Sequence, residues 1–546
     1  MCKCRYWPAW EGMLLSKKIK AIVADCSIDD IWDKVLARLE IEGALELSYC
    51  VIASKPKFEK QLETFKASHP DTIFHDAIEA TMGLPALKLK VPVIDEPKLR
   101  ALAEHEAIVM RMLDRMDPTD CFTYRDRYRH YIRLLSYWSA VLEEIKPDLV
   151  LFGLTPHMGW DYVLYILARH SGIRTVMFSL NSALGRVMWS ETIGSYSDRV
   201  AHSYLSPPTL SSREINSIDN HLQLTRQEYT HAKPRYAAML ETLNQGEKVN
   251  WTLKTPLRPL KSAVWVLIFA GRKLRRVLDR VFPPASLYVK NYWKHPNMTF
   301  ESSHYSARER MGVEKYKLGR LAQLNKCYET LSIKLSENDL NTPFIFLALH
   351  YQPEATTSPE GGYYVDQRLI VDALSRSLPK GWRLYVKEHY LQLKAKSSKG
   401  WQSRDLQFYK DIVEHSNVRL VSLETSSFTL IDSSKAMATI TGYAAWEALV
   451  RGKPAILFGR PWFGACPGAY MVKSVEEIHS AILKISDPSN CPDSAAVRDY
   501  IIAYYAVSFA GFRSKWNKEA SGLTNEQNIE AFCKAIRGYL AYRFNA

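Results

Sequence analysis

Polar residues follow five predicted strands in the second half of the chain. The carboxyl ends of parallel strands meet at one edge of a sheet, so side chains placed there converge on one crevice. Lysine, histidine and serine side chains beside a helix N-terminus are suited to hold a phosphate. The residues, in strand order, are His350, Gln352 and Glu354; Lys387, Glu388 and His389; Thr425, Ser426 and Ser427; Gly442 and Glu447; and Arg460.

These residues predict a nucleotide site. Glu447 lies one helical turn beyond Tyr443, where its carboxylate can accept hydrogen bonds from ribose hydroxyls, and a phosphate beside a ribose indicates a nucleotide. Each residue also has a simple structural alternative: Ser427 as a helix cap, Lys387 as an edge charge, and Glu447 as the partner of Arg451 at i+4. Five polar strand ends together favour the site. The residues assigned to nucleotide binding are Lys387, His389, Ser426, Ser427, Gly442 and Glu447.

A second set of candidates lies in the first half. Residues 149–152 form a predicted buried strand, 155–160 a loop, 161–170 a helix that ends before Gly172, and 174–179 the next strand. His157 and Asp161 therefore lie at the carboxyl end of a strand, where a catalytic base or nucleophile could act. The alternative is that Asp161 caps its helix and His157 is an ordinary loop histidine.

The element that organises the second half is residues 437–459. The β-branched run 437–441, the turn at Gly442, the helix 443–451, Gly452 as C′ residue, Pro454 as helix stop and the run 455–458 predict strand, helix and strand. Two strands joined by a helix are expected to be parallel neighbours. Strands are also predicted at 344–349 and within 381–390, residues 204–336 are predicted to connect rather than form sheet, and the chain after Gly459 is predicted to be a loop and then mainly helical.

The alternation of strands and helices predicts an α/β protein with two Rossmann-like domains facing across a cleft. There is no Walker A motif, no GxGxxG and no convincing DxD after a strand, which argues against phosphoryl transfer, dinucleotide redox chemistry and a metal-dependent transferase. Two such domains without a metal are the plan of GT-B glycosyltransferases. The loop residues His350, Gln352, Glu354 and Arg460 would then contact donor or acceptor. The predicted ranges are 1–203 for the acceptor domain, 204–340 for a basic helical connection, 341–500 for the nucleotide-sugar domain and 501–546 for C-terminal helices.

The formal charge of +14 is locally clustered. An apolar run at 263–270 is too short to span a bilayer but is flanked by basic residues, as in helices that lie on anionic membranes. The alternative is a helix packed on its own protein with a solvated basic face. No nucleic-acid-binding signature accompanies the charge, so we expect no nucleic-acid partner. The predicted membrane-contact residues are Trp265, Phe269, Arg272, Lys273, Arg275 and Arg276.

Nine scattered cysteines, without a second Cys/His cluster near Cys2 and Cys4, indicate reduced thiols rather than a zinc site. No signal peptide or membrane span is evident. We therefore expect a cytoplasmic protein, peripheral on the inner membrane, without metal or cofactor.

Several segments resemble bacterial capsule polysaccharide biosynthesis proteins, the group that contains the capsule Kdo transferases. They are DLVLFGLTPHMGWDYVLYILARHSGIRTV in the first half and LHYQPEATTSPEGGYYVDQ, LYVKEHY and TITGYAAWEALVRGKPAILFGRPWFGACPG in the second. The resemblance implies a GT-B transferase that uses a CMP-activated acidic sugar, Kdo first. In that family a Lys-x-His-Pro segment helps to hold the donor phosphate, which corresponds to Lys387 and His389. Here Tyr390 replaces the proline, which bears on loop geometry and donor choice.

The expected function is transfer of a sugar from a nucleotide donor to a glycan or lipid-linked acceptor, within a capsule assembly complex at the inner membrane. Two alternatives remain open. One is a UDP-sugar transferase or epimerase of the same fold, and the other is a non-catalytic component of polysaccharide assembly or export that binds glycan.

Overall fold

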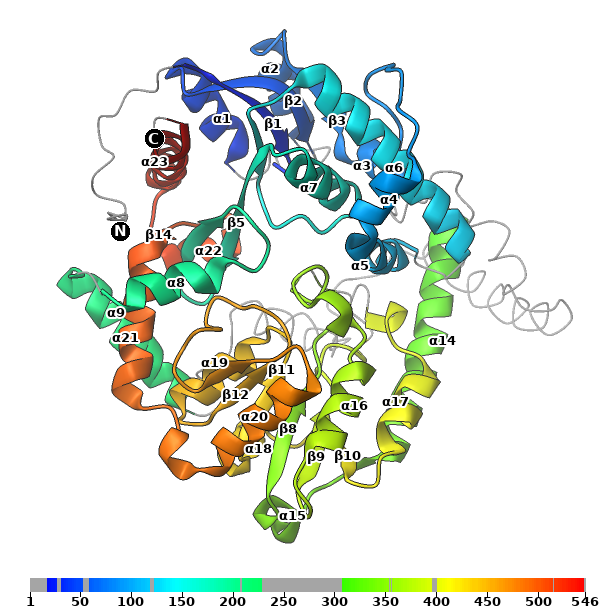
Figure 1. Cartoon of the computed structure of the whole chain (residues 1–546), viewed down its shortest axis with the longest axis vertical. Helices are drawn as coiled ribbons and strands as arrows, with labels where there is room; N and C mark the ends of the chain where they lie inside the picture. Colours follow the sequence, from blue (N-terminus) through cyan, green and yellow to red (C-terminus); the bar gives the residue numbers. More distant parts are fainter. Residues whose placement is uncertain are drawn as a thin grey trace, which may run out of the picture.

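The chain forms two α/β domains that face each other (Figure 1). The structure, a computed structural model, describes residues 17–26, 31–52, 58–117, 122–206, 209–227, 307–352, 354, 356–394, 400–513 and 515–544. Within these ranges each domain is built on a seven-stranded sheet with helices on both faces. The predicted fold class, two Rossmann-like domains across a cleft, is confirmed.

The N-terminal sheet has the order β14-β6-β5-β4-β1-β2-β3. Strands β3, β2, β1, β4 and β5 are parallel neighbours, whereas β6 and β14 are antiparallel. Successive connections run outward in opposite directions from β1 and β4, which makes this pair the topological switch point. The strands are β1 (Ile19–Ala24), β2 (Leu45–Ile52), β3 (Ile73–Asp76), β4 (Leu149–Phe152), β5 (Arg174–Asn181), β6 (Arg186–Ser190) and β14 (Phe509–Ala510).

Helices cover both faces of this sheet because its central strands are apolar on both sides, as parallel strands require. One face packs against α1 and α23, and the other against α5, α6 and α7. The helices of the N-terminal half and the C-terminal ones are α1 (Trp32–Ile41), α2 (Glu59–Ala67), α3 (Ala77–Met82), α4 (Glu96–Ala101), α5 (Ala103–Arg115), α6 (Tyr124–Ile145), α7 (Trp160–His170), α8 (Tyr196–Tyr204), α9 (Ser212–Arg226), α21 (Ser494–Val507), α22 (Lys515–Ser521) and α23 (Asn525–Phe544).

The C-terminal sheet has the order β13-β12-β11-β8-β9-β10-β7, and every neighbouring pair is parallel. Its switch point lies between β8 and β11. The elements are β7 (Ser332–Ile333), β8 (Phe344–Ala348), β9 (Arg383–Lys387), β10 (Val418–Val421), β11 (Ala436–Thr439), β12 (Ala455–Leu457), β13 (Ala469–Met471), α14 (Ala307–Leu331), α15 (Glu337–Asn341), η4 (Gly362–Val365), α16 (Arg368–Ser377), η5 (Gly400–Gln402), α17 (Leu406–Val413), α18 (Ser427–Ser433), α19 (Tyr443–Val450), α20 (Val475–Ser486) and η6 (Pro488–Asn490).

The predicted strand-helix-strand unit at 437–459 is confirmed as β11, α19 and β12. Met437 pairs with Ala455 in parallel register. Gly452 follows the C-cap of α19 with φ +74°, and Gly172 follows that of α7 with φ +73°, the left-handed conformation that glycine adopts without strain.

Three short strands depart from the sequence-based expectation. Strand β7 lies inside the range predicted to be free of sheet, β13 lies in the predicted loop after Gly459, and β14 lies in the region predicted to be mainly helical. All three have two or three residues, too few for a sequence pattern, and they exist because an already formed sheet offers them partners.

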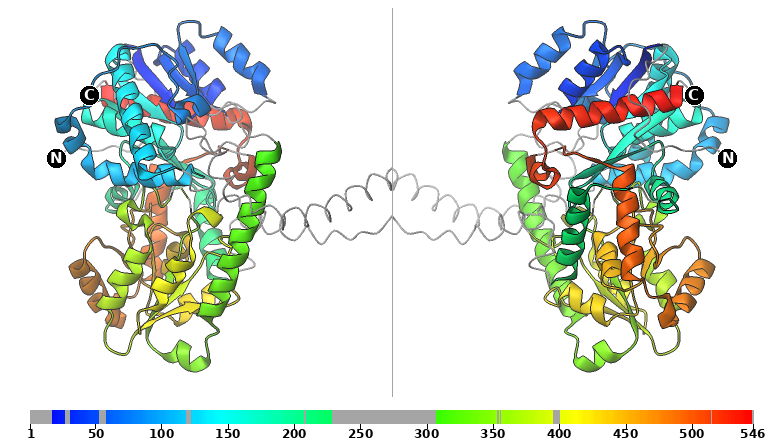
Figure 2. Two further views of the ribbon diagram at one scale, coloured as in Figure 1. Left: turned by 90° about the vertical axis from the view of Figure 1, so that its right-hand side faces the viewer. Right: turned by 90° about the vertical axis from the view of Figure 1, so that its left-hand side faces the viewer.

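Helix α21 joins the two domains. It packs against α8 and α9 and also contacts α19 of the C-terminal domain (Figure 2). After α21 the chain adds β14 to the N-terminal sheet and places α23 against α1. The C-terminal residues therefore complete the first domain, which the linear order of the sequence does not reveal.

Candidate functional site

At the switch point of the C-terminal sheet, His350, which follows β8, lies in contact with the turn at Gly442, which follows β11. The Thr441 backbone N–H donates to His350 Nε2 at 3.0 Å. Gly442 has an ordinary φ of −62°, so a turn is not what requires glycine here. A Cβ at Gly442 would lie 2.8 Å from Thr439 Oγ1 and 3.2 Å from His350 Nε2. The glycine is needed because the two strand ends approach closely.

His350 connects neighbouring loops through hydrogen bonds. Since its Nε2 accepts from Thr441, the ring carries its proton on Nδ1, which lies 3.9 Å from Glu354 Oε2. Its backbone N–H donates to Gln367 Oε1 at 2.8 Å. The ring is buried, so the structure places His350 in the framework behind the loop rather than at its surface.

Lys387 ends β9 and reaches the loop before α18. Its ammonium donates to the Thr425 carbonyl at 2.6 Å and to Ser427 Oγ at 3.1 Å. Burial lowers the pKa of Lys387 to about 8. Ser426 is the N-cap of α18, and its hydroxyl accepts from the Thr429 N–H at 3.4 Å. The structure thus brings Lys387 and Ser427 together and uses Ser426 as the cap.

His389 follows two residues later and is held by aromatic neighbours. Its ring centroid lies 4.9 Å from that of Tyr390 and 5.8 Å from that of Tyr351. The Leu391 N–H donates to His389 Nδ1 at 3.3 Å. Burial lowers the pKa of His389 to about 4. At neutral pH the ring is therefore neutral, with Nε2–H as its donor. Tyr390, which stands where the resemblance expects proline, supplies one of these aromatic contacts.

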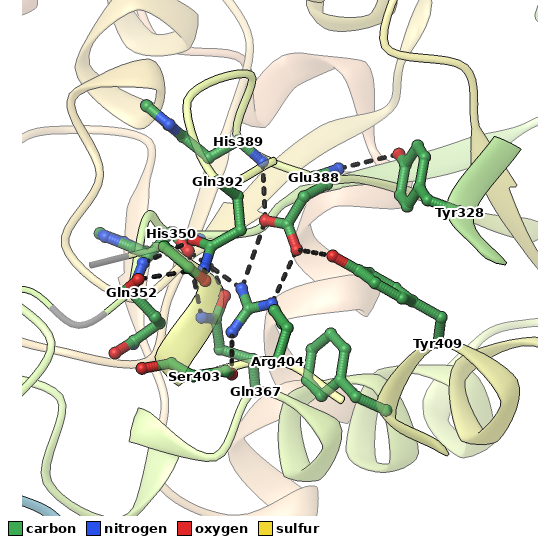
Figure 3. A network of polar contacts seen from close by, with 12 residues as sticks. Tyr328, His350, Gln352, Gln367, Glu388, His389, Gln392, Ser403, Arg404 and Tyr409 are labelled. Carbon is green, nitrogen blue, oxygen red and sulfur yellow. Dashed lines mark hydrogen bonds and ion pairs between the residues drawn. The ribbon is translucent and has the colours of Figure 1, made fainter. Parts of the chain in front are cut away.

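Between Lys387 and His389 lies the buried carboxylate of Glu388, the centre of a polar network (Figure 3). Arg404 Nε donates to Glu388 Oε2 at 2.7 Å, the Tyr409 hydroxyl donates to the same oxygen at 2.8 Å, and the His389 N–H donates to Oε1 at 2.8 Å. Arg404 also donates to the His350 carbonyl at 3.1 Å. The network fixes the loop after β9 against the loop after β8. Sequence reasoning missed Arg404, because no local pattern marks it.

Glu447 lies on α19, half-buried. Burial raises the pKa of its carboxyl to about 8, against the opposing effect of Arg451. The ion pair of Arg451 is with Asp432, not with the residue at i−4. A carboxyl protonated at pH 7 can both donate and accept a hydrogen bond.

Arg460, expected near donor or acceptor, bridges the two domains. Its Nη2 lies 2.8 and 2.9 Å from the two carboxylate oxygens of Asp198 on α8. On the same side of the interface, His221 Nε2 accepts from the Tyr443 hydroxyl and from Trp446 Nε1, both at 3.1 Å. These contacts hold α8 and α9 against the second domain.

On the N-terminal side Asp161 is completely buried. Its carboxylate accepts from the backbone N–H groups of His157, Met158 and Tyr162 at 2.6 to 2.8 Å. Burial, together with the charge of Asp25, raises the pKa of Asp161 to about 7. Asp161 thus fixes the loop that precedes α7, which is close to the capping alternative.

His157 is half-buried in that loop. A carbonyl accepts only, so His157 Nδ1–H donates to the Thr155 carbonyl at 2.8 Å and Nε2 keeps the lone pair. The loop lies near the second domain, because the Thr155 side chain is close enough to the Glu360 carboxyl to oppose the rise in its pKa. Burial raises the pKa of Glu360 to about 8. Sequence reasoning missed Glu360, although it lies in the quoted segment after β8.

Two sequence-based expectations concern features away from this cleft. The predicted membrane-contact residues Trp265, Phe269, Arg272, Lys273, Arg275 and Arg276 lie outside the described residues. Within the described ranges, none of the helices has the length and apolar character needed to cross a bilayer. The same ranges contain no group of three or more His, Cys, Asp or Glu side chains arranged to hold a metal ion.

Residues 268–476 match the model of a family described as capsule polysaccharide biosynthesis protein. The match covers the C-terminal sheet as far as α20, which is less than half of the chain. The matched region, residues 268–476, contains Lys387, His389, Gly442 and Glu447, whereas His157 and Asp161 lie outside it. Among curated proteins no sequence matches the chain significantly.

Solved structures of low identity are similar to this chain. One is the β-Kdo 2,7 transferase of Thermosulfurimonas dismutans KpsC, at 13% identity and TM-score 0.19, over 33% of this chain and 58% of that one. The β-Kdo 2,4 transferase of the same protein has 11% identity and TM-score 0.27, over 61% and 78%. The UDP-GlcNAc 2-epimerase of Neisseria meningitidis has 12% identity and TM-score 0.19, over 96% and 100%. At these scores the likenesses carry no inference about substrate.

Proposed function

We propose that this protein is a glycosyltransferase of capsule or surface polysaccharide synthesis that transfers a sugar from a nucleotide donor. The observation that carries the proposal is the contact between Lys387 and Ser427, two residues before His389, at the carboxyl end of β9 and within the matched residues 268–476. The N-terminal α/β domain holds the acceptor in this proposal.

The phosphate of the donor binds between the ammonium of Lys387, the hydroxyl of Ser427 and the Nε2–H of neutral His389. A charged donor on a phosphate makes a stronger hydrogen bond than a neutral one, so Lys387 supplies most of the affinity. Glu447, protonated at pH 7 because of its raised pKa, pairs with the ribose hydroxyls. Gly442 lets the first turn of α19 approach the nucleotide.

His157 activates the acceptor. Its Nδ1–H is held by the Thr155 carbonyl, which orients Nε2 as a general base. Over the reaction, the bond between the anomeric carbon and the phosphate oxygen breaks and its electron pair leaves with the nucleotide. The acceptor hydroxyl oxygen forms the new bond to that carbon, and its proton passes to His157 Nε2. Asp161 positions this loop through its backbone hydrogen bonds.

The donor we infer is a CMP-linked acidic sugar, with CMP-Kdo as first choice. A single phosphate matches a site built from one lysine, one histidine and one serine. The quoted sequence segments resemble the group that contains the capsule Kdo transferases, which favours Kdo as the sugar. The acceptor is a glycan or a lipid-linked glycan, and the basic segment around Trp265 and Phe269 holds the enzyme at the inner membrane beside the capsule assembly complex.

A donor screen on the purified full chain tests the proposal. CMP-Kdo, other CMP-sugars and UDP-sugars are incubated with capsule oligosaccharide or lipid-linked acceptor, and released nucleotide is measured. We expect CMP release that requires acceptor, and a CMP affinity at least tenfold weaker in Lys387→Met and His389→Ala. Lys410→Met, an exposed lysine on α17, is the matched control and should bind CMP normally.

The outcomes separate the alternatives. Release of UDP, or an isomerised sugar without acceptor, indicates the epimerase-type enzyme. Capsule polymer binding without any nucleotide binding indicates an assembly or export component. His157→Ala should lower the transfer rate by about 10²- to 10⁴-fold with unchanged CMP affinity, while His170→Ala, an exposed histidine on α7, should transfer normally.

A further inference from the structure

A cavity of about 290 Å³ lies between the two domains, away from Lys387 and Ser427. Helix α5 forms its N-terminal wall, and the loop after β8, the start of α16, helix α14 and the segment after η5 form the other walls. Its volume is near the lower end of the range of ligand pockets, which is about 300–1,000 Å³. The cavity therefore suits one sugar unit rather than a whole nucleotide sugar.

Several of the charged side chains that line this cavity already have partners of opposite charge. Arg404 pairs with Glu388. Arg368 pairs with Asp366 at 2.9 Å and with Asp411 at 3.0 Å. Arg111 lies 3.5 Å from Asp114 and 3.8 Å from Asp366. The opposite charges within these pairs neutralise each other, so these side chains offer little net charge to a ligand.

Arg115, in the last turn of α5, is different. Its side chain is buried, with 7% of the residue exposed, and Nη2 has no hydrogen-bond partner. In the described part of the chain no carboxylate lies within ion-pair distance of its guanidinium, and the attraction that acts on it comes from the more distant Asp161. Burial lowers the pKa of Arg115 to about 10, so it is charged at pH 7. A buried charge without a partner is costly, and a ligand that accepts its hydrogen bonds would remove that cost.

Other donors that line the cavity are also unsatisfied. Gln352 Nε2, Ser358 Oγ and Trp401 Nε1 are buried and have no hydrogen-bond partner among the described residues. Each residue is less than 6% exposed. These donors, together with Arg320 Nε, which also lines the cavity and has no hydrogen-bond partner among the described residues, call for an acceptor-rich anion. The guanidinium fork of Arg115 matches a carboxylate in both charge and geometry.

We propose that this cavity binds the carboxylate of an acidic sugar, with Arg115 from the N-terminal domain and Gln352 and Ser358 from the C-terminal domain as its donors. The ligand therefore bridges the two domains and stabilises their closed arrangement. That the anion belongs to a sugar rests on the proposed function, whereas the presence of an anion site does not.

Binding to the full chain, measured by isothermal titration calorimetry, tests this inference. The probes are free Kdo, its uncharged methyl ester, inorganic phosphate and, separately, CMP. We expect Kdo to bind at least tenfold more tightly than the ester. Arg115→Met and Gln352→Leu should each weaken Kdo at least tenfold and leave the affinity for CMP unchanged. Arg100→Met, which removes an exposed arginine on the neighbouring helix α4, should change neither.

Equal Kdo affinity in wild type and Arg115→Met overturns the site, as does equal affinity for Kdo and its ester. Phosphate binding that depends on Arg115, without Kdo binding, overturns the sugar carboxylate. If Arg115→Met fails to fold, Arg115→Lys decides: a retained charge without the fork should still weaken Kdo, and unchanged binding contradicts the proposal. CMP binding without Kdo binding overturns this inference alone, and Kdo binding without CMP binding overturns the proposed donor site alone.

Discussion

Arg404 Nε and Glu388 Oε2 lie 2.7 Å apart, and their side chains are 2% and 0% exposed. The pair stands between the two residues that we propose to hold the donor phosphate and the loop that faces the first domain. Both ions are well satisfied, since Glu388 also accepts from Tyr409 and from the His389 N–H, and Arg404 also donates to the His350 carbonyl. The pair therefore sets the positions of two loops at once.

Removing one partner of this pair should lower the free energy of unfolding far more than removing both. Arg404→Met leaves the Glu388 carboxylate buried without its cation, and we expect a loss of about 3–5 kcal/mol in unfolding free energy. The double variant Glu388→Gln, Arg404→Met should recover much of that loss because no charge remains buried. Urea unfolding, followed by circular dichroism, measures both.

Arg368 provides the matched control for the buried pair. Its partners Asp366 and Asp411 are partly exposed, so Arg368→Met should cost only about 0–1 kcal/mol. A loss in Arg404→Met no greater than in Arg368→Met would contradict the importance of burial here.

The affinity for CMP should fall as the pH rises above 8. Burial lowers the pKa of Lys387 to about 8 in the free site, and an anion binds to the charged form. Below pH 8 the ammonium is present and the affinity is constant. Above it, each pH unit should weaken binding by up to about tenfold, until the higher pKa of the occupied site is reached. Calorimetry at pH 7, 8, 9 and 9.5 gives this profile.

Lys387→Arg is the control for the pH profile. Arginine does not titrate in this range, so whatever affinity it retains should be flat between pH 7 and 9.5. A flat profile in the wild type would mean that Lys387 does not contact the phosphate.

Gly442→Ala should destabilise the C-terminal domain and weaken CMP. The added Cβ would lie 2.8 Å from Thr439 Oγ1 and 3.2 Å from His350 Nε2, and overpacking of this kind costs about 1–3 kcal/mol. Gly319→Ala on helix α14 meets nothing within 4 Å and should be neutral or stabilising by about 1 kcal/mol. Thermal unfolding of the two variants, with CMP titration, makes the comparison; equal behaviour would show that the strand ends can relax.

The Arg460–Asp198 pair allows a test of whether Arg460 serves a ligand or the interface. Both side chains are partly exposed, so the pair should contribute about 0–1 kcal/mol to stability. If Arg460 acts through Asp198, Arg460→Ala and Asp198→Ala should change the apparent KM for acceptor by the same factor. A larger effect of Arg460→Ala, with Asp198→Ala near wild type, would indicate direct ligand contact.

Some features of this protein follow from local sequence alone. The run from Met437 to Gly459 predicts β11, α19 and β12 because β-branched residues, a helix-forming segment and a glycine at the helix C′ position act through neighbours along the chain. The same reasoning places Gly172 after α7. The carboxyl ends of β8, β9 and β11 were predictable as one polar edge, since parallel strands share a direction.

Tertiary structure decided the rest. Gly442 is required by the approach of His350 from another strand, Arg460 meets Asp198 of the other domain, and β14 joins a sheet that begins almost 500 residues earlier. Arg404 completes Glu388 although no local pattern marks it, and Arg115 is left without a partner by the way α5 meets the second domain. Local patterns specify elements, because their interactions lie within one or two helical turns or one strand. Tertiary packing brings distant residues together. It therefore decides which polar side chains have hydrogen-bond partners within the protein and which do not.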